Sequence, residues 1–534
     1  MAYQSYNKIL GQRDSRAKVK EGIELAADLV SPTLGHSSRR ILIDQEFGEI
    51  IMSDDGTTIL NSIKTEDPDI GLGVKVAKEA SAKTNTDEGD GTTTTAVILR
   101  ELVSQLLKGN SKDDHLVQQE SGANTKVRKE IEDGLTKVLE YVDQNKIEIT
   151  SNEQIAFVGK VSSNDASIGS ILAEVFEKLG KDGAVSVEEG RSVETTYKIV
   201  EGMSFNQGWL APQFVTDDER EEAILDDGVN ILVSSKKLQD VEDIKHIIEL
   251  IKSGVNNLLI VADDVSGVVL NSIVANKLMG SIRAIAVKAP VTGNTKDLLQ
   301  DICIATGATL IGEDVKIEEL NRSHLGGADR VVVTKDKTVI VGFSGDKEKI
   351  DERVKQLEHR KTEMESEYEK NKLNERIAKL KTGVGSIKVG GSTPMEIKDK
   401  KAKIDDAVAA VKSALRGGIV AGGGVALLMA SHTLGDSEGH KILKKAIQQP
   451  FRQILENADI YDGASSKGIK EGQGYNVEAE KCGDMVEMGI IDPANVVKSA
   501  VRNAVSSALM VSNLGGSINL IRKNKDENNQ SNLN

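Results

Sequence analysis

A glycine- and threonine-rich run ahead of a predicted helix constrains this chain more than any other segment. It is Asp87-Glu-Gly-Asp-Gly-Thr-Thr-Thr-Thr95, and an apolar stretch with helical spacing, Ala96 to Val103, follows directly. Glycines let a backbone approach an anion closely, threonine hydroxyls and helix N-terminal N–H groups donate to phosphate oxygens, and Asp90 offers an oxygen ligand to Mg²⁺. The run therefore predicts a nucleotide phosphate site. The alternative is an N-capped helix with a threonine-rich first turn.

Three further segments favour the same chemistry. Ser31-Pro-Thr-Leu-Gly35 ends an amphipathic helix with a glycine turn, and Ser53-Asp-Asp-Gly-Thr-Thr58 is an acidic turn after the apolar strand Ile50 to Met52. Towards the other end, Ile419-Val-Ala-Gly-Gly-Gly-Val-Ala-Leu427 leads into a helix, although a triple glycine can also serve close packing alone. The common P-loop pattern, G-x-x-x-x-G-K-S/T, does not occur in the sequence.

Length and composition set the class of protein. A chain of 534 residues is too long for one compact core, so two to four domains are expected. Its 83 acidic and 68 basic residues give a net charge of −15, which argues against a general nucleic-acid binder. The two cysteines, Cys303 and Cys482, are far apart and are expected to be buried apolar fillers rather than a disulfide or zinc site. No stretch approaches the roughly 20 apolar residues of a membrane span, so no membrane contact and a cytoplasmic location are expected.

The hydrophobic pattern divides the chain into helical ends and a mixed middle. The first ~145 residues are predicted to be mainly helical, because apolar residues recur at helical spacing. From Val185 onwards, short β-rich runs alternate with helices, as in an α/β domain. Two charged stretches with apolar positions at i, i+4 and i+7 predict an antiparallel helical hairpin: Ile350, Val354 and Leu357, then Leu373, Ile377 and Leu380. Helices return after Gly383 and continue to Leu514, so noncontiguous domains are expected.

In their order along the chain, these segments resemble the chaperonins, and the GroEL-type group I branch most closely. The resemblance extends from about residue 8 to about residue 520. It depends on the following motifs: Thr33-Leu-Gly35, Asp55-Gly56, Gly89-Asp-Gly-Thr-Thr-Thr94, Val200-Glu-Gly-Met203, Lys288-Ala-Pro290, Lys401-Ala-Lys-Ile-Asp-Asp-Ala407, Ala421-Gly-Gly-Gly-Val-Ala-Leu427, Gly474-Tyr-Asn476 and Gly489-Ile-Ile-Asp-Pro493.

The resemblance implies a multi-domain α and α/β fold with the chaperonin architecture. On that plan, residues 1–145 and 417–522 form a helical equatorial ATP-binding domain. Residues 146–200 and 384–416 form a small intermediate α/β hinge domain, and residues 201–383 form an inserted α/β apical domain that binds polypeptides. The polar residues 523–534 are expected to be a disordered tail. Hinge motion is assigned to Gly202, Gly383 and Gly418, with a plain turn role as the alternative.

The resemblance also assigns the nucleotide site residue by residue. Asp90 is expected on Mg²⁺, and Asp406 and Asp55 are the expected catalytic carboxylates, of which Asp406 orients the attacking water. ATP and Mg²⁺ are the implied cofactors, with K⁺ as an optional third. The residues expected to bind nucleotide are Thr33, Leu34, Gly35, Gly56, Gly91, Thr92, Thr93, Thr94, Gly422, Gly423, Asn476 and Asp492.

Two departures from the group I pattern concern this site. His36-Ser37-Ser38 stands where Pro-Lys-Gly is usual, which removes a rigid turn and a cation near the phosphates. Asp54 stands where a lysine is usual, and a second negative charge beside Asp55 is unfavourable near a triphosphate unless a metal, Arg39 or Arg40 offsets it.

In the middle of the chain, the resemblance implies an apolar groove for non-native polypeptides. Trp209, Phe214, Ile248, Leu270 and Val274 are its expected residues, and an ordinary core role is the alternative for each. The implied protein is an ATP-hydrolysing chaperonin that forms a homo-oligomeric ring of seven subunits and accepts a co-chaperonin lid. A ring-forming passive holdase or scaffold with a weakened ATPase is the alternative, favoured by Asp54 and His36.

Overall fold

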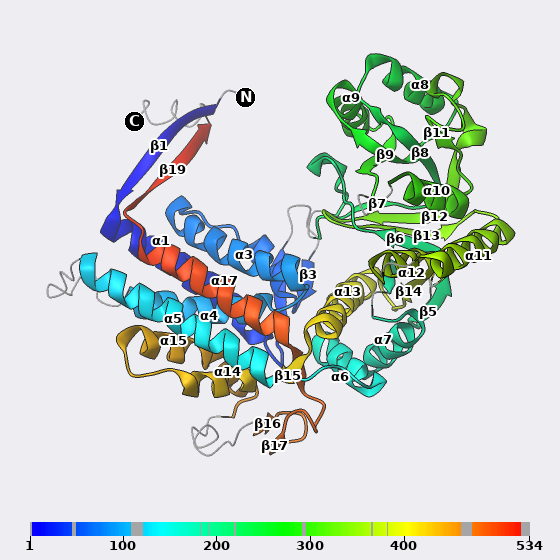
Figure 1. Cartoon of the computed structure of the whole chain (residues 1–534). Coiled ribbons are helices and arrows are strands. Elements are labelled where there is room, and N and C mark those ends of the chain that lie inside the picture. The colour runs from blue at the N-terminus through cyan, green and yellow to red at the C-terminus, as the bar shows by residue number, and fades with distance from the viewer. Residues whose placement is uncertain are drawn as a thin grey trace. The chain divides into compact units, whose positions relative to one another are not determined.

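The computed structural model divides the chain into two compact units. Unit 1 comprises Met1–Glu174 and Thr393–Asn534, and unit 2 comprises Val175–Ser392. The two ends of the chain therefore fold together and the middle is inserted between them (Figure 1), as the sequence predicts. The two units do not separate the predicted intermediate domain, so the three-domain plan stays a prediction. The structure describes residues 3–44, 50–107, 121–181, 183–190, 192–217, 220–290, 295–364, 367–381, 383–460 and 473–524.

Unit 1 is mainly helical. Helix α17 packs against α3, α4 and α5, and α1 packs against α3 and α4. In α1 the apolar residues Val19, Ile23, Ala26 and Val30 share one buried face, as their spacing predicts. The helices of unit 1 are α1 (Gln12–Val30), α2 (Gly56–Ser62), α3 (Pro68–Glu88), α4 (Thr92–Leu106), α5 (Ser121–Asn145), α6 (Asn152–Ser163), α13 (Pro394–Gly417), α14 (Val425–Ala430), α15 (Glu438–Ile447), α16 (Gln449–Asn457) and α17 (Ala494–Ser512).

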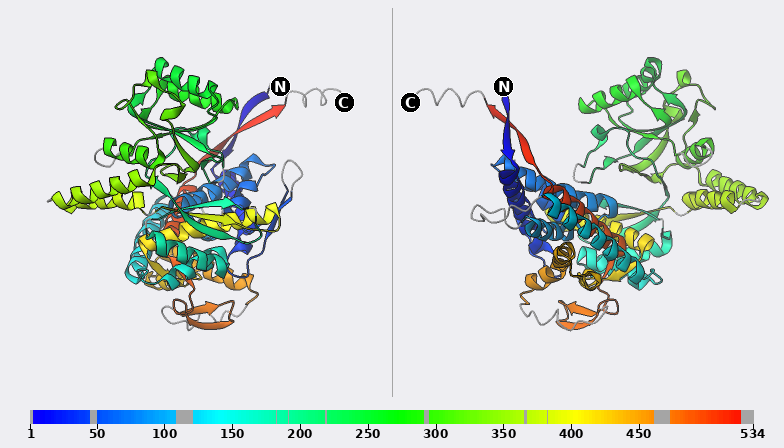
Figure 2. Two further views of the ribbon diagram at one scale, coloured as in Figure 1. Left: turned by 90° about the vertical axis from the view of Figure 1, so that its right-hand side faces the viewer. Right: turned by 60° about the vertical axis from the view of Figure 1, so that its left-hand side comes forward.

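Four small antiparallel sheets complete unit 1. The two termini of the described chain pair with each other along one ribbon (Figure 2), in which Ile9 is opposite Ile518. This ribbon corrects the predicted tail, because the second strand continues to Asn524, while residues 525–534 of the tail lie outside the described residues. The pairs are β1 (Tyr3–Gly11) with β19 (Gly516–Asn524), β2 (Ile41–Asp44) with β3 (Ile50–Ser53), β15 (Ile419–Ala421) with β18 (Ile491–Pro493), and β16 (Gln473–Asn476) with β17 (Lys481–Asp484).

Unit 2 is the predicted α/β region and contains two sheets. In the larger sheet the order is β10-β9-β8-β12-β13-β6, with β11 beside β8 and β7 beside β12. Strands β8, β9 and β10 are parallel, and β12, β13 and β6 are antiparallel. The strands are β6 (Gly202–Phe205), β7 (Ala223–Leu225), β8 (Val229–Leu238), β9 (Asn257–Val265), β10 (Arg283–Lys288), β11 (Leu310–Ile311), β12 (Gly326–Val333) and β13 (Thr338–Phe343), and the smaller sheet is β4 (Ala184–Glu189), β14 (Val384–Val389) and β5 (Thr196–Val200).

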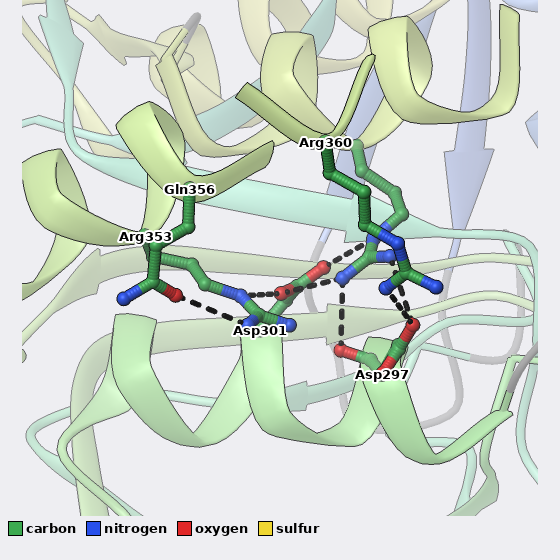
Figure 3. Close-up of polar contacts among 6 residues, drawn as sticks. Asp297, Asp301, Arg353, Gln356 and Arg360 are labelled. Carbon is green, nitrogen blue, oxygen red and sulfur yellow. Dashed lines mark hydrogen bonds and ion pairs between the residues drawn. The ribbon is translucent and has the colours of Figure 1, made fainter. Parts of the chain in front are cut away.

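The predicted helical hairpin is present in unit 2, and an ionic cluster fixes it to α10. Arg353 and Arg376 both contact the buried carboxylate of Asp301, with Nε to oxygen distances of 2.9 and 2.7 Å. Arg360 and Arg376 contact Asp297, one turn earlier on α10 (Figure 3). The helices of unit 2 are α8 (Val241–Lys252), α9 (Gly267–Leu278), α10 (Thr295–Thr306), α11 (Lys347–Glu363) and α12 (Glu367–Lys381); α7 (Ala166–Leu179) crosses from unit 1 to unit 2.

The two cysteines differ in their surroundings. Cys303 is buried in α10, and desolvation raises the pKa of its thiol to about 12. Cys482 is exposed on β17, so the expectation that it is a buried filler is wrong. None of the helices within the described residues is long and apolar enough to cross a membrane.

Candidate nucleotide-binding site

A cavity of about 350 Å³ lies within unit 1. It is lined by the turn after α1, the N-termini of α2 and α4, the C-terminal end of α6, one face of α13, and the segments around α14, β16 and β18. Its volume is in the range of small-molecule sites. The residues predicted from both ends of the sequence therefore meet in one place.

The turn between α3 and α4 presents Asp90 and the start of α4 to this cavity. Gly89 and Gly91 both have left-handed backbone angles, with φ of +77° and +89°, and these reverse the chain on either side of Asp90. Gly91 is the N-cap of α4 and provides no side-chain acceptor for the first N–H groups of the helix, and Thr92, Thr93 and Thr94 line the cavity. Such a helix start is suited to binding an anion.

The Asp90 carboxylate is held by two hydrogen bonds. The N–H of Gly91 donates to Oδ1 at 2.6 Å, and the hydroxyl of Ser162 on α6 donates to Oδ2 at 2.9 Å. Desolvation raises the pKa of Asp90, these two bonds oppose that effect, and the nearby charge of Asp55 adds to it. A bound cation would remove the unfavourable part of this arrangement.

Asp55 is the N-cap of α2. Its carboxylate accepts hydrogen bonds from the N–H groups of Thr57 and Thr58 and from the Thr58 hydroxyl. The adjacent Gly56 is buried where a Cβ atom would be 2.7 Å from the hydroxyls of both Thr92 and Thr93. The start of α2 therefore packs closely on the start of α4, and Asp55 both caps a helix and lines the cavity.

The turn Thr33-Leu34-Gly35 forms another wall of the cavity. Gly35 has a φ of +89°, and the Thr33 hydroxyl is 3.3 Å from the Thr93 hydroxyl. Asn457, which is buried on α16, donates to the carbonyl of Leu34 at 2.8 Å. Asn457 was not predicted, because nothing in the local sequence of α16 indicates a partner that is 423 residues away.

Gly423, Asn476 and Asp492 are also in the lining of the cavity, and their contact with a nucleotide stays a prediction. Desolvation and the charge of Asp90 raise the pKa of Asp492 to about 7. Gly422 is not among the lining residues, because it packs against the backbone of Ile491, and its neighbour Gly424 takes the lining position.

Asp406 lines the cavity from α13, and a lysine that was not predicted accompanies it. Lys403 is one turn earlier on the same helix, and its Nζ atom is 3.0 Å from Oδ2 of Asp54. His36 also lines the cavity, and its Nδ1 atom is 2.9 Å from the side-chain oxygen of Asn164. Arg40 contacts Asp399 rather than Asp54.

The charges around the cavity favour a bound cation. Among the described residues of its lining, the basic side chains apart from histidine are Lys160 and Lys403, and both are paired with carboxylates. At 4 Å and an effective dielectric constant of 20, two like charges repel by about 4 kcal/mol. No three acidic, histidine or cysteine residues in the described part of the chain form a metal cluster, but Mg²⁺ needs only one or two carboxylates when phosphates supply the rest. The lining carboxylates are Asp54, Asp55, Asp90, Asp406, Glu478 and Asp492.

Four of the five predicted polypeptide-binding residues are partly exposed on unit 2. Trp209, Ile248, Leu270 and Val274 pack with one side against its core. Phe214 is fully buried in that core, so its prediction as a contact residue is corrected. Sequence reasoning missed the most exposed apolar side chains of this region, which are Val241 on α8, Val268 and Leu278 on α9, and the adjacent Met279.

The three predicted hinge glycines differ in their backbone. Gly383 and Gly418 have positive φ angles of +71° and +80°, which favour glycine. Gly202 is the first residue of β6, and a Cβ atom there would be 2.6 Å from the side chain of Val384. Close packing therefore explains Gly202, and its hinge role stays a prediction.

Comparisons with known proteins identify the family of this chain and the class of its fold. The sequence model of the TCP-1/cpn60 chaperonin family matches residues 26–513, and the chain belongs to that family. The structure is similar to two crystal structures of the chaperonin gp146 from the bacteriophage EL 2 (Pseudomonas aeruginosa), both in the presence of ATP-BeFx. For crystal form II the TM-score is 0.62 at 20% identity, covering 96% of this chain and 98% of that one. For crystal form I the TM-score is 0.61 at 20% identity, covering 96% and 99%.

Proposed function

We propose that this chain is an ATP-dependent chaperonin that binds non-native polypeptides in a ring cavity and promotes their folding. The observation that carries the proposal is the cavity of unit 1 that Asp90 and Asp406 line. It gathers Asp90, the uncapped start of α4 and Asp406 from opposite ends of the sequence. Membership of the chaperonin family and the crystal structures of gp146 in the presence of ATP-BeFx support it.

Six side chains of the cavity lining have a role in this proposal. The N–H groups and hydroxyls of Thr92, Thr93 and Thr94 bind phosphate oxygens, and Asp90 holds Mg²⁺, which when bound screens the phosphate charge. Asp406 orients the attacking water from α13. Asn476 binds the nucleoside end of ATP.

The experiment that tests the ATPase compares two adjacent carboxylates of α13. We expect Asp406→Ala to bind ATP almost normally and to hydrolyse it at least about tenfold more slowly, because the carboxylate acts on the water. Asp405→Ala is the matched control, since Asp405 is not part of the cavity lining. Normal turnover by Asp406→Ala, or a wild type without ATPase above background, would contradict the proposal and favour the passive holdase.

Exposed apolar side chains on the small sheets of unit 1 support a ring. Ile9, Ile518 and Leu520 are more than half exposed on the β1–β19 ribbon, as are Leu42 and Ile50 on the β2–β3 hairpin. An unpartnered apolar ribbon is an association surface. We expect a large oligomer by light scattering, disrupted by Ile518→Asp. A mass near 57.4 kDa for the wild type under all conditions would contradict it.

Capture of non-native chains is assigned to α8 and α9. Leu270 and Val274 are one turn apart on α9, and the exposed Leu278 is one turn further along the same side of the helix. Burial of apolar area against a client requires no particular client sequence. We expect Leu270→Ser with Val274→Ser to weaken suppression of client aggregation while the oligomer stays intact. Unchanged suppression would assign both residues to core packing.

A further inference from the structure

A lysine–aspartate pair lines the cavity together with Asp55. The Nζ atom of Lys403 on α13 is 3.0 Å from Asp54 Oδ2 and 3.5 Å from Asp399 Oδ2. Asp54 directly precedes Asp55, and Lys403 is three residues before Asp406 on the same helix. Lys403, Asp54, Asp55 and Asp406 all line the cavity.

The pair is largely removed from solvent but incompletely satisfied. The side chains of Lys403 and Asp54 are 21% and 13% exposed. Within the described residues, the second carboxylate oxygen of Asp54 is buried and has no hydrogen-bond partner. The other lysine of the lining, Lys160, pairs with Glu478, and these two side chains are more exposed. Lys403 is therefore the lysine whose charge is held beside Asp54, in the same part of the cavity wall as Asp55.

We propose that Lys403 binds the terminal phosphate of ATP from this position, in which Asp54 holds it. A lysine ammonium has three N–H donors, so it can keep its contact with Asp54 while it donates to a phosphate oxygen. This inference rests on the proposed function and adds a phosphate-binding residue to it. Because residues i and i+3 share a helix face, a phosphate bound by Lys403 also brings the face of α13 that carries Asp406 onto the triphosphate.

The competing account is that Lys403 only neutralises Asp54. On that account, removing the lysine leaves an unpaired carboxylate that repels every nucleotide, and removing both charges restores binding. On the proposed account, the loss is specific to the triphosphate and persists when both charges are removed. The double variant Asp54→Asn with Lys403→Met therefore separates the two accounts, and it also avoids an isolated buried charge that could disturb folding.

The experiment measures the dissociation constants of Mg-ATP and Mg-ADP by calorimetry on the full chain, with thermal unfolding of each variant. For Lys403→Met we expect the dissociation constant of ATP to rise at least about tenfold, because a hydrogen bond to a charged group contributes at least that much to affinity. The dissociation constant of ADP should change less than about threefold. The double variant keeps this difference. Lys403→Arg retains most of the ATP affinity. Lys400→Met is the matched control, because Lys400 pairs with Glu396 on the same helix and is not in the lining.

Three results would overturn the inference. The first is an equal loss of affinity for ATP and ADP, the second is an unchanged ATP affinity of Lys403→Met, and the third is recovery of ATP affinity in the double variant. Each of these would mean that Lys403 only neutralises Asp54. The proposed function would still hold if the wild type hydrolyses ATP. A wild type that binds neither nucleotide would overturn both.

Discussion

Two clusters of carboxylates in this chain differ in whether arginine side chains pair with them. In unit 2, Asp297 and Asp301 on α10 are matched by Arg353, Arg360 and Arg376 from the α11–α12 hairpin. In unit 1, Asp55, Asp90 and Asp492 line one cavity, and within the described residues the lining supplies no arginine to balance them.

The difference separates a structural cluster from a binding site. Buried carboxylates are costly unless they are paired, and a cluster that serves only packing contains its own counter-charges. In the cavity, desolvation and mutual repulsion instead raise the pKa of Asp90 and bring that of Asp492 to about 7. Carboxylates left in this state are typical of a site that is completed by a cation.

The largest expected effect is on the matched cluster. Asp301→Ala leaves Arg353 and Arg376 without their buried partner and should destabilise unit 2 by about 3–5 kcal/mol. The single tryptophan, Trp209, is in unit 2, so urea unfolding followed by its fluorescence measures this change. Glu358→Ala, which removes an exposed ion pair with Lys381, is the control and should have little effect. A similar loss of unfolding free energy in both variants would contradict the structural role of the buried cluster.

In contrast to Asp301, Asp90 should matter for the affinity for Mg-ATP and not for the stability of the fold. We expect Asp90→Ala to leave the apo protein as stable as wild type or more stable, because the variant removes a charge that the fold disfavours. Its Mg-ATP affinity should fall at least about tenfold, the factor that accompanies the loss of one charged contact. Calorimetry with unfolding of the apo protein measures both quantities. A destabilised variant with normal affinity would make Asp90 a structural residue.

A smaller effect is expected for Asp492 and depends on pH. The raised pKa means that the folded state holds a proton that the unfolded chain releases near pH 3.8, so stability is lost as pH rises from about 4 to 7. Asp492→Asn removes this loss and should be more stable than wild type at pH 8 by roughly 1–3 kcal/mol. This is less than the full free energy that the pKa shift implies, because the side chain is partly exposed and solvent screens its charge. Urea unfolding at pH 5 and pH 8 without metal measures the difference. If the difference in unfolding free energy between Asp492→Asn and wild type is no larger at pH 8 than at pH 5, the raised pKa of Asp492 is contradicted.

Sequence reasoning found the residues whose roles depend on local pattern. The glycines around Asp90, the helical hairpin, and the apolar face of α1 follow from spacing and backbone chemistry. What it missed are pairings between distant segments, and its errors at Phe214 and Cys482 concern burial. The Lys403–Asp54 pair spans 349 residues, and the β1–β19 ribbon joins the two ends of the chain. Phe214 was misplaced because an aromatic residue beside a turn has the same sequence signal whether it faces solvent or the core.

The most direct test of the account is hydrogen–deuterium exchange with and without saturating Mg-ATP. We propose that the cavity carboxylates bind a metal ion together with a triphosphate. We therefore expect strong protection from exchange in the α3–α4 turn, residues 87–95, and in α13 around residues 403–408. Omitting Mg²⁺ should abolish most of that protection. Unchanged exchange in both segments at saturating Mg-ATP would contradict the nucleotide site and leave the unmatched carboxylates of unit 1 unexplained.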